Sequence, residues 1–180
     1  MNSINQQQPE NNHRYLQADE SIKKIKELVT ASKTCFLATV KSTPNANSAR
    51  PMSVRKVDDN GHLWFLSASD SHQNLDIQSN PTVTLYFQGG PHSEFLLLHG
   101  AATISRDRKK IEELWEPIIK TWFTGGIDDP RITVLQVIPS EGYYWDTKHG
   151  DFIAGIKMMV GAISGKTLDD SIEGRLQLNR

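Results

Sequence analysis

Residues 50–87 read RPMSVRKVDDNGHLWFLSASDSHQNLDIQSNPTVTLYF, and this stretch decides the fold that the sequence predicts. Asn60-Gly61 is a strong signal for a tight hairpin turn. Residues 48–56 and 62–68, which lie on either side of that turn, are therefore expected to form two paired strands. A short helix follows them, and the alternation of apolar residues over 81–88 predicts the next strand.

Polar side chains in the same stretch predict a site for one small anion. Ser71 can cap a helix that runs to about Ser79, where Asn80-Pro81 ends it. The first turn of a helix has backbone N–H groups without partners and a partial positive charge, which together attract an anion. Arg50 and Arg55 on the preceding strand would add full charge. The pattern indicates a phosphate-bearing cofactor, although each residue alone also fits a structural role as a helix cap or an edge-strand charge.

The rest of the chain predicts further strands, with two helices against them. The expected elements are a helix from Asp19, strands over 34–40 and 94–105, a helix over 111–122, and strands near 132–138 and 141–145. Gly100 lies inside one of these strands and indicates a β-bulge, as a bent strand requires. Pro117 should kink the second helix or divide it in two.

Composition and length fit one soluble domain. The chain has 180 residues and a net charge of −1, and its Lys and Arg residues do not cluster as a nucleic-acid surface would require. No segment approaches the roughly 18 consecutive apolar residues of a membrane span. Residues 1–17 resemble no secretory signal, so we expect a flexible arm there and a cytoplasmic protein. We assign 18–150 to the domain and 151–180 to a partly helical C-terminal tail.

Several kinds of catalytic site lack a sequence signal. The single cysteine, Cys35, lies in the apolar run TCFLATV and is interpreted as a core residue. The six histidines have no metal-ligand spacing, so we expect no metal site. Neither a G-x-S-x-G elbow nor a phosphate-binding P-loop occurs in the chain. Asp128 and Asp129 are expected to brace the loop before Pro130 rather than to act in catalysis.

A series of short motifs follows one order through most of the chain. They are RPMSVR at 50–55, FLSA at 65–68, SHQ at 71–73, NP at 80–81, GAATI at 100–104, DRKKIEELWEP at 107–117, WFTGGIDDP at 122–130 and YWD at 144–146. In this order and spacing the chain resembles the FMN-binding split-barrel proteins related to pyridoxamine 5'-phosphate oxidase. Within that superfamily it is most similar to the bacterial general stress proteins.

The resemblance implies a fold, a cofactor and an assembly. The fold is a mostly β, antiparallel split barrel of six or more strands with flanking helices. The cofactor is FMN, or less commonly FAD or a deazaflavin, held at the interface of a homodimer. The residues assigned to the cofactor are Arg50, Pro51, Met52, Ser53, Arg55, Leu66, Ser67, Ser71, His72, Gln73, Trp122 and Trp145. Trp145 is the candidate for a contact from the partner subunit.

Two departures from the family pattern bear on function. Gln73 stands where the family usually has a lysine, which replaces a full charge by an amide donor and should weaken phosphate binding. His72 stands where the oxidases have an arginine, and it would assist only when protonated. After Trp145 the oxidases carry an Arg-x-His segment that grips their substrate, whereas this chain reads DTKHGD at 146–151. The sequence therefore argues against oxidation of vitamin B6.

The function that follows is a flavin-dependent oxidoreductase that takes hydride from a reduced nicotinamide or another small donor. The cofactor would carry the redox chemistry, which agrees with the lack of a visible nucleophile or acid/base pair. Two alternatives use the same residues. One is a module that binds or stores a flavin without turnover, and the other is a structural dimer whose cofactor site has decayed.

Overall fold

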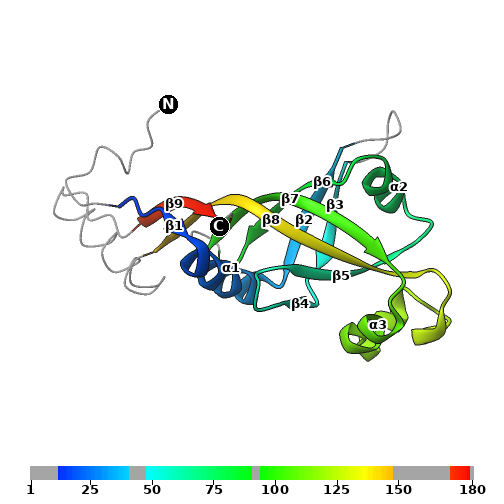
Figure 1. Cartoon of the computed structure of the whole chain (residues 1–180). Coiled ribbons are helices and arrows are strands. Elements are labelled where there is room, and N and C mark those ends of the chain that lie inside the picture. Colours follow the sequence, from blue (N-terminus) through cyan, green and yellow to red (C-terminus); the bar gives the residue numbers. More distant parts are fainter. Residues whose placement is uncertain (1–11, 41–47, 91–93, 148–170, 179–180) are drawn as a thin grey trace.

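The computed structural model describes residues 12–40, 48–90, 94–147 and 171–178. Within these ranges the chain forms one strongly curved sheet with helices against it (Figure 1). The strands are β1 Leu16–Gln17, β2 Thr34–Thr39, β3 Ala49–Ser53, β4 Lys56–Val57, β5 Leu63–Ala68, β6 Thr82–Gln88, β7 Phe95–Ser105, β8 Ile132–Thr147 and β9 Ser171–Gln177. The helices are α1 Ala18–Ser32, α2 His72–Ser79 and α3 Arg108–Leu114, with 3-10 turns η2 Pro117–Thr121 and η3 Gly126–Asp128.

The described strands form an open sheet in the order β1-β9-β8-β7-β6-β2-β3, and β5 pairs with both β8 and β4. All pairings are antiparallel except that of β1 with β9. The expected mostly β fold with flanking helices is confirmed. The predicted hairpin is confirmed only next to its turn, where Lys56 pairs with Trp64 and Gly61 has a φ of 79°. The predicted strand over 48–56 is divided, because Ala49–Ser53 forms the separate strand β3 and pairs with β2 instead.

One long strand, β8, serves two parts of the sheet. Its first half pairs with β5 and its second half pairs with β9. The change occurs beside Gly100, where the β7–β8 register shifts, as the sequence predicted. A Cβ atom on Gly100 would lie 2.4 Å from the carbonyl oxygen of Ile138, so a side chain does not fit there. The prediction of two final strands is wrong, because the bulge lets one strand continue through Pro139, which has no N–H to donate.

The helices follow the sequence prediction with one correction. Ser71 caps α2 and Asn80 ends it, as predicted, and the second helix is divided at Pro117 into α3 and η2. Asp19 is not the cap of α1, because the helix begins one residue earlier and its N-cap, Gln17, makes no side-chain cap hydrogen bond.

Two apolar clusters form the core. The larger one fills the space enclosed by the barrel strands and α1, with fully buried Ile25, Leu37, Leu63, Phe65, Leu85, Leu98, Leu135 and Val137. The smaller one lies under α3 and η2 and contains Ile111, Leu114, Ile119, Phe123, Ile132 and Val134.

The two ends of the described chain meet at the edge of the sheet. Residues 1–17 were expected to form a flexible arm, but 12–17 lie against β9, where the Arg14 N–H donates to the Glu173 carbonyl oxygen (2.9 Å). The Tyr144 hydroxyl donates to the Arg14 carbonyl oxygen at 2.9 Å. β9 itself lies in the tail, for which the sequence predicted helix near 156–165, and that segment lies outside the described residues.

Candidate functional site

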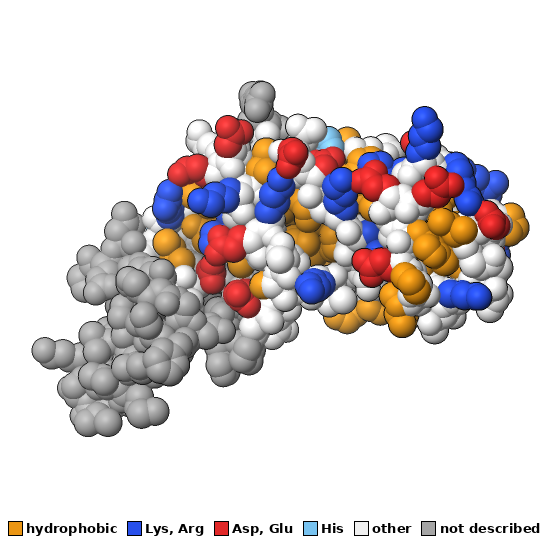
Figure 2. All heavy atoms as spheres, turned by 90° about the horizontal axis from the view of Figure 1, so that it is seen from below, with side chains coloured by type: hydrophobic (Ala, Val, Ile, Leu, Met, Phe, Trp, Pro, Cys, Tyr) orange, Lys and Arg blue, Asp and Glu red, His pale blue; other side chains and the backbone are white. Residues whose placement is uncertain are grey.

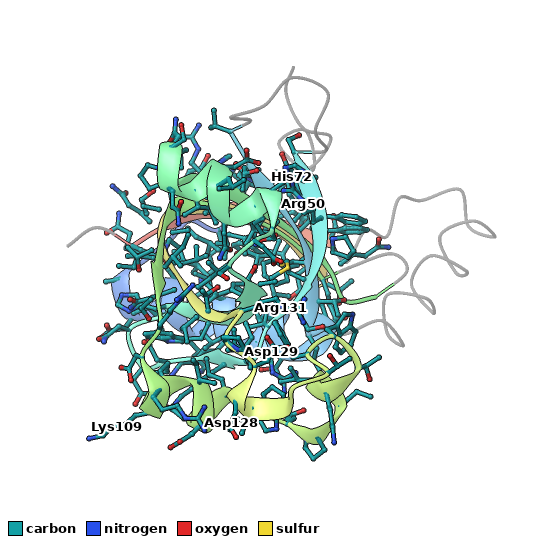
Figure 3. The ribbon with its side chains drawn as sticks, turned by 90° about the vertical axis from the view of Figure 1, so that its right-hand side faces the viewer. Arg50, His72, Lys109, Asp128, Asp129 and Arg131 are labelled. Carbon is teal, nitrogen blue, oxygen red and sulfur yellow. The ribbon has the colours of Figure 1, made fainter. Side chains whose placement is uncertain are left out.

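Helix α2 lies across one end of the barrel and covers it with polar side chains. In Figure 3, which looks at this end, Arg50 and His72 lie near the junction of β3 and α2. Arg50 projects from β3 in alternation with the exposed Pro51, and Ser67 lies on the buried face of β5. Strand alternation thus brings a cation and a hydroxyl from separate strands to the start of one helix.

Ser67 and Ser71 form the hydroxyl pair that the sequence predicted. Their Oγ atoms lie 3.4 Å apart, and Ser71 Oγ also accepts the backbone N–H of Asn74 (3.2 Å) as the helix cap. Behind the pair, the Thr133 hydroxyl donates to the Ser67 carbonyl oxygen (2.8 Å) and accepts from the Asn74 side-chain amide (2.8 Å). This relay fixes the amide of Asn74, whose Oδ1 is a buried acceptor without a partner among the described residues.

Arg50 faces a buried carboxylate on α2. Its Nη1 lies 3.7 Å from Asp76 Oδ2, and that carboxylate, with a side chain only 1% exposed, accepts the Thr39 hydroxyl at 2.7 Å. Arg50 Nη1 is buried and donates no hydrogen bond within the described part of the chain. The sequence analysis did not predict four residues of this end as site residues, namely Thr39, Asp76, Asn74 and Thr133. Their signal was the composition of α2, which packs on the barrel with few apolar residues and must therefore bury polar ones.

The two residues after Ser71 differ in exposure. Gln73 is only 2% exposed, and its Nε2 is a buried donor for which the described residues offer no acceptor. His72 is exposed at the start of α2. The structure therefore places an amide donor, and not a charge, in the buried position beside the Ser71 cap.

Arg55 points away from this cluster. Its Nη2 pairs with Glu116 (2.5 Å), and its Nε donates to the Leu114 carbonyl oxygen at 3.3 Å. The other predicted positions on these strands also diverge. Met52 packs on the barrel core, Leu66 packs on the smaller core cluster, and Ser53 is exposed. Of the predicted residues, the structure therefore brings together Arg50, Ser67, Ser71 and Gln73 at this end of the barrel.

A hollow on the outer face of the sheet gathers two more predicted residues. Pro51 and Trp145 both line this cavity, which has a volume of about 470 Å³ and is mostly apolar. Phe36 and Tyr86, which are 57% and 52% exposed, also line it. Such a surface suits a flat aromatic ring or the apolar face of another protein.

The two predicted tryptophans lie apart from α2. Trp145 pairs with Phe95 at the start of β7, whereas Ser105 at the other end lines a cavity beside α2. β7 has 11 residues, so at about 3.3 Å per residue the two ends are up to roughly 33 Å apart. Trp122 follows η2 and is 65% exposed, near Ile118 at 60%. Within one chain Trp145 therefore lies far from this cavity beside α2, and it lines the hollow with Pro51 instead.

Charged residues brace the loop that leads into β8, as predicted. Arg131 donates two side-chain hydrogen bonds to Asp129, and this pairing lowers the pKa of Asp129 to about 2. Asp128 pairs with Arg108, and the Arg131 carbonyl oxygen accepts the Ser69 N–H at 2.7 Å. Figure 3 shows this bracing loop at the same end of the molecule as Arg50. The loop thus fixes the segment that enters α2.

The described residues show no reactive cysteine and no metal site. Cys35 lies in the core as expected, and burial raises its pKa to about 12. Within the described ranges no three His, Cys, Asp or Glu side chains are placed to hold a metal ion. Figure 2 shows acidic and basic side chains interspersed over the face that carries α1 and β4. No helix among the described residues is long and apolar enough to cross a membrane.

Comparison with known proteins gives a consistent result. The model of the family described as "Pyridoxamine 5'-phosphate oxidase like" matches residues 20–169. A curated relative, protein bli-3 of Neurospora crassa, is 24% identical over 135 residues, which cover 70% of this chain and 65% of the relative. The chain thus spans about two thirds of the length of that relative.

Solved structures share the fold. General stress protein 26 of Bacillus anthracis is 23% identical with a TM-score of 0.60, covering 68% of this chain and 92% of its own. A Clostridium acetobutylicum protein related to general stress protein 26 is 25% identical with a TM-score of 0.59, and the match covers 70% of this chain and 88% of that protein. The general stress FMN/FAD binding protein of Xanthomonas citri is 23% identical with a TM-score of 0.58, covering 68% and 84%.

Proposed function

Because the chain belongs to the pyridoxamine 5'-phosphate oxidase-like family, we propose that it binds a flavin nucleotide, FMN or a derivative of it, with a phosphate at the start of α2. The observation that carries this proposal is a pair of buried donors, Arg50 Nη1 and Gln73 Nε2, without acceptors among the described residues. An unsatisfied buried donor costs about 1–3 kcal/mol, so a ligand oxygen there is stabilising. The name of the Xanthomonas citri neighbour supports the same class of ligand.

The residues present fit a phosphate group. The hydroxyls of Ser67 and Ser71 and the free N–H groups at the start of α2 are donors, and Arg50 adds a guanidinium whose charge Asp76 largely balances. From there the ring system would extend over β3 toward the hollow lined by Pro51 and Phe36. When bound, a flavin supplies two-electron redox chemistry, and the proposed reaction is oxidation of a reduced nicotinamide or another small donor.

A second copy of the chain completes the proposed site. Four large apolar side chains on the outer face of the sheet are between 41% and 57% exposed, namely Phe36, Tyr86, Ile138 and Trp145. A contiguous apolar surface of this kind is typical of a protein–protein interface. Pairing two such faces would remove it from water. Trp145 lines the same hollow as Pro51, so pairing two of these faces would set Trp145 of one copy against the hollow of the other, which supports its role as a contact from the partner.

Bound flavin measured after gentle purification tests the proposal. We expect a visible flavin spectrum, or uptake of added flavin by the purified chain with quenching of its fluorescence. Ser71→Ala should weaken binding about tenfold, because it removes a hydroxyl and the helix cap. Ser79→Ala, at the other end of the same helix, is the control. A folded protein that takes up no flavin would refute the proposal.

Turnover separates an oxidoreductase from a binding module. We expect the flavin-loaded protein to oxidise a reduced nicotinamide faster than the same concentration of free FMN does. A rate equal to that of free FMN, with flavin still bound, would instead assign the chain a binding or storage role.

A further inference from the structure

The predicted phosphate site is balanced in charge. Arg50 faces Asp76, which is almost fully buried and cannot swing away into solvent. Arg55 is paired with Glu116. A third cation is expected from the resemblance at position 73, but this chain places a neutral, buried glutamine there. Each arginine that the sequence assigned to the phosphate therefore already has a carboxylate.

Among the described residues, neighbouring groups do not restore a positive charge. Asp70, exposed immediately before Ser71, adds a negative one, and Arg131 is engaged with Asp129. His72 is exposed at the helix start. What remains is a set of neutral donors, namely the hydroxyls of Ser67 and Ser71, the Gln73 amide and the N–H groups of α2. Such a set satisfies phosphate oxygens but compensates little charge.

The charge of the ligand then becomes decisive. A phosphate monoester such as that of FMN carries nearly two negative charges at neutral pH, with a second pKa of about 6. Each of the two phosphates in FAD carries one charge at neutral pH, so FAD spreads its two charges over two positions. Beside the buried Asp76 carboxylate the second charge is unfavourable, because like charges repel strongly where solvent screens them little.

A polar cavity adjoins the same loop. Its volume is about 450 Å³, and it is lined by Ser69, Asp70, Asn74, Gln78, Ile104, Ser105, Arg106 and Thr133. Asn74 is fully buried, and its relay to Thr133 leaves Oδ1 as an acceptor without a partner in the described chain. A ligand that ended at the first phosphate would leave this cavity and this acceptor unused.

Together these observations support one ligand class, on the premise that the proposed flavin site is correct. We infer that the site selects a flavin joined through a phosphodiester, of which FAD is the available example, over the FMN monoester. The extension beyond the first phosphate lies in the polar cavity. There the extension meets the polar side chains that line the cavity, and Arg106 faces the second phosphate.

Dissociation constants for FAD, FMN and riboflavin on the full chain test the inference. We expect FAD to bind at least about tenfold more tightly than FMN at pH 7.5. Tighter binding of FMN than of FAD overturns the inference but leaves the proposed function intact. Failure of all three ligands to bind overturns the proposed function itself.

A pH series provides a test that does not depend on the absolute affinities. Lowering the pH from 7.5 to 5.5 protonates the FMN monoester, so the preference for FAD should narrow several-fold, because the diester does not titrate there. The same pH series in His72→Ala removes any contribution of that side chain from the ratio. A ratio independent of pH overturns the charge argument.

Arg106→Ala should weaken FAD severalfold and leave FMN unchanged, with Lys109→Ala, another exposed cation at this end, as the control. An equal effect of Arg106→Ala on both ligands overturns the placement of the extension.

Gln73→Lys should increase the affinity for FMN more than the affinity for FAD, provided that the melting temperature of the variant shows a folded protein. A preference for FAD undiminished in folded Gln73→Lys overturns the role assigned to residue 73.

Discussion

Asp76 is the residue that most changes the character of the barrel end. A carboxylate buried this completely is retained only when hydrogen bonds and a cation compensate it, here Thr39 and Arg50. Replacing Arg50 would remove the guanidinium that lies 3.7 Å from this buried carboxylate. The same pairing that stabilises Asp76 therefore also limits how much of the Arg50 charge is available to a ligand.

Residue identities were predictable where a local rule applies. Ser71 was found because helix caps have a narrow set of side chains, and Cys35 because it lies in an apolar run. Asp76 and Asn74 were not found, because a polar residue on a helix reads as solvent-facing unless the surface beneath is known to be polar. Arg55 was assigned to the anion cluster from its place on the same predicted strand as Arg50 and from the family pattern, yet in the structure it pairs with Glu116.

Cys35 should be inert in the folded protein. With its pKa raised to about 12 by burial, the thiolate fraction at pH 8 is roughly a thousandfold smaller than that of an ordinary thiol. We expect iodoacetamide to leave the native chain unmodified over hours and to alkylate it rapidly in denaturant. Mass spectrometry gives the readout, and rapid native alkylation would show that the strand end around Cys35 opens.

The Asp129–Arg131 pair should make stability depend on acid pH. The folded pKa of Asp129 is about 2, below its ordinary value of 3.8, so its contribution is present above pH 4 and is lost as the pH falls toward 2. Asp129→Asn should therefore lower the melting temperature at pH 6 but make little difference near pH 2. Asp128→Asn, at an 80% exposed side chain, is the control and should change little at pH 6. An Asp129→Asn effect of equal size at both pH values would contradict the assignment.

At the scale of elements, local signals located most helices and strands but could not show their continuity. The hairpin, the bounds of α2 and the division at Pro117 follow from turn and cap chemistry confined to a few residues. β8 was divided because Pro139 and Gly142 resemble a turn when read alone. Their true context is the bulge in β7, which is distant in sequence. β9 was missed because its polar sequence becomes a strand only through pairing with β8.

Gly100→Ala tests the bulge. The added methyl group would meet the Ile138 carbonyl oxygen at 2.4 Å, so β7 or β8 must shift, at a cost of about 1–3 kcal/mol. Thr103→Ala, on the exposed face of the same strand, is the matched control and should cost much less. Urea denaturation measures both, and equal losses for the two variants would mean that the strands separate there without strain.

At the scale of the whole molecule, the outer face of the sheet predicts a dimer. Phe36→Glu places a charge in the middle of that face and should shift the protein to a monomer in light scattering. Ile118→Glu, at a similarly exposed apolar residue in η2, should leave the assembly unchanged. A monomeric parent protein, or a dimer that survives Phe36→Glu, would exclude this face as the interface.

The meeting of β1 with β9 has a consequence for how the chain folds. Their contacts join residues that are among the most distant in sequence, so forming them requires the largest search by the unfolded chain. The pairing of β1 with β9 is short and lies at the edge of the sheet, so we expect it to form last during folding and to break first during unfolding. Hydrogen–deuterium exchange should find the amides of Arg14 and Glu173 far less protected than those of the central strands.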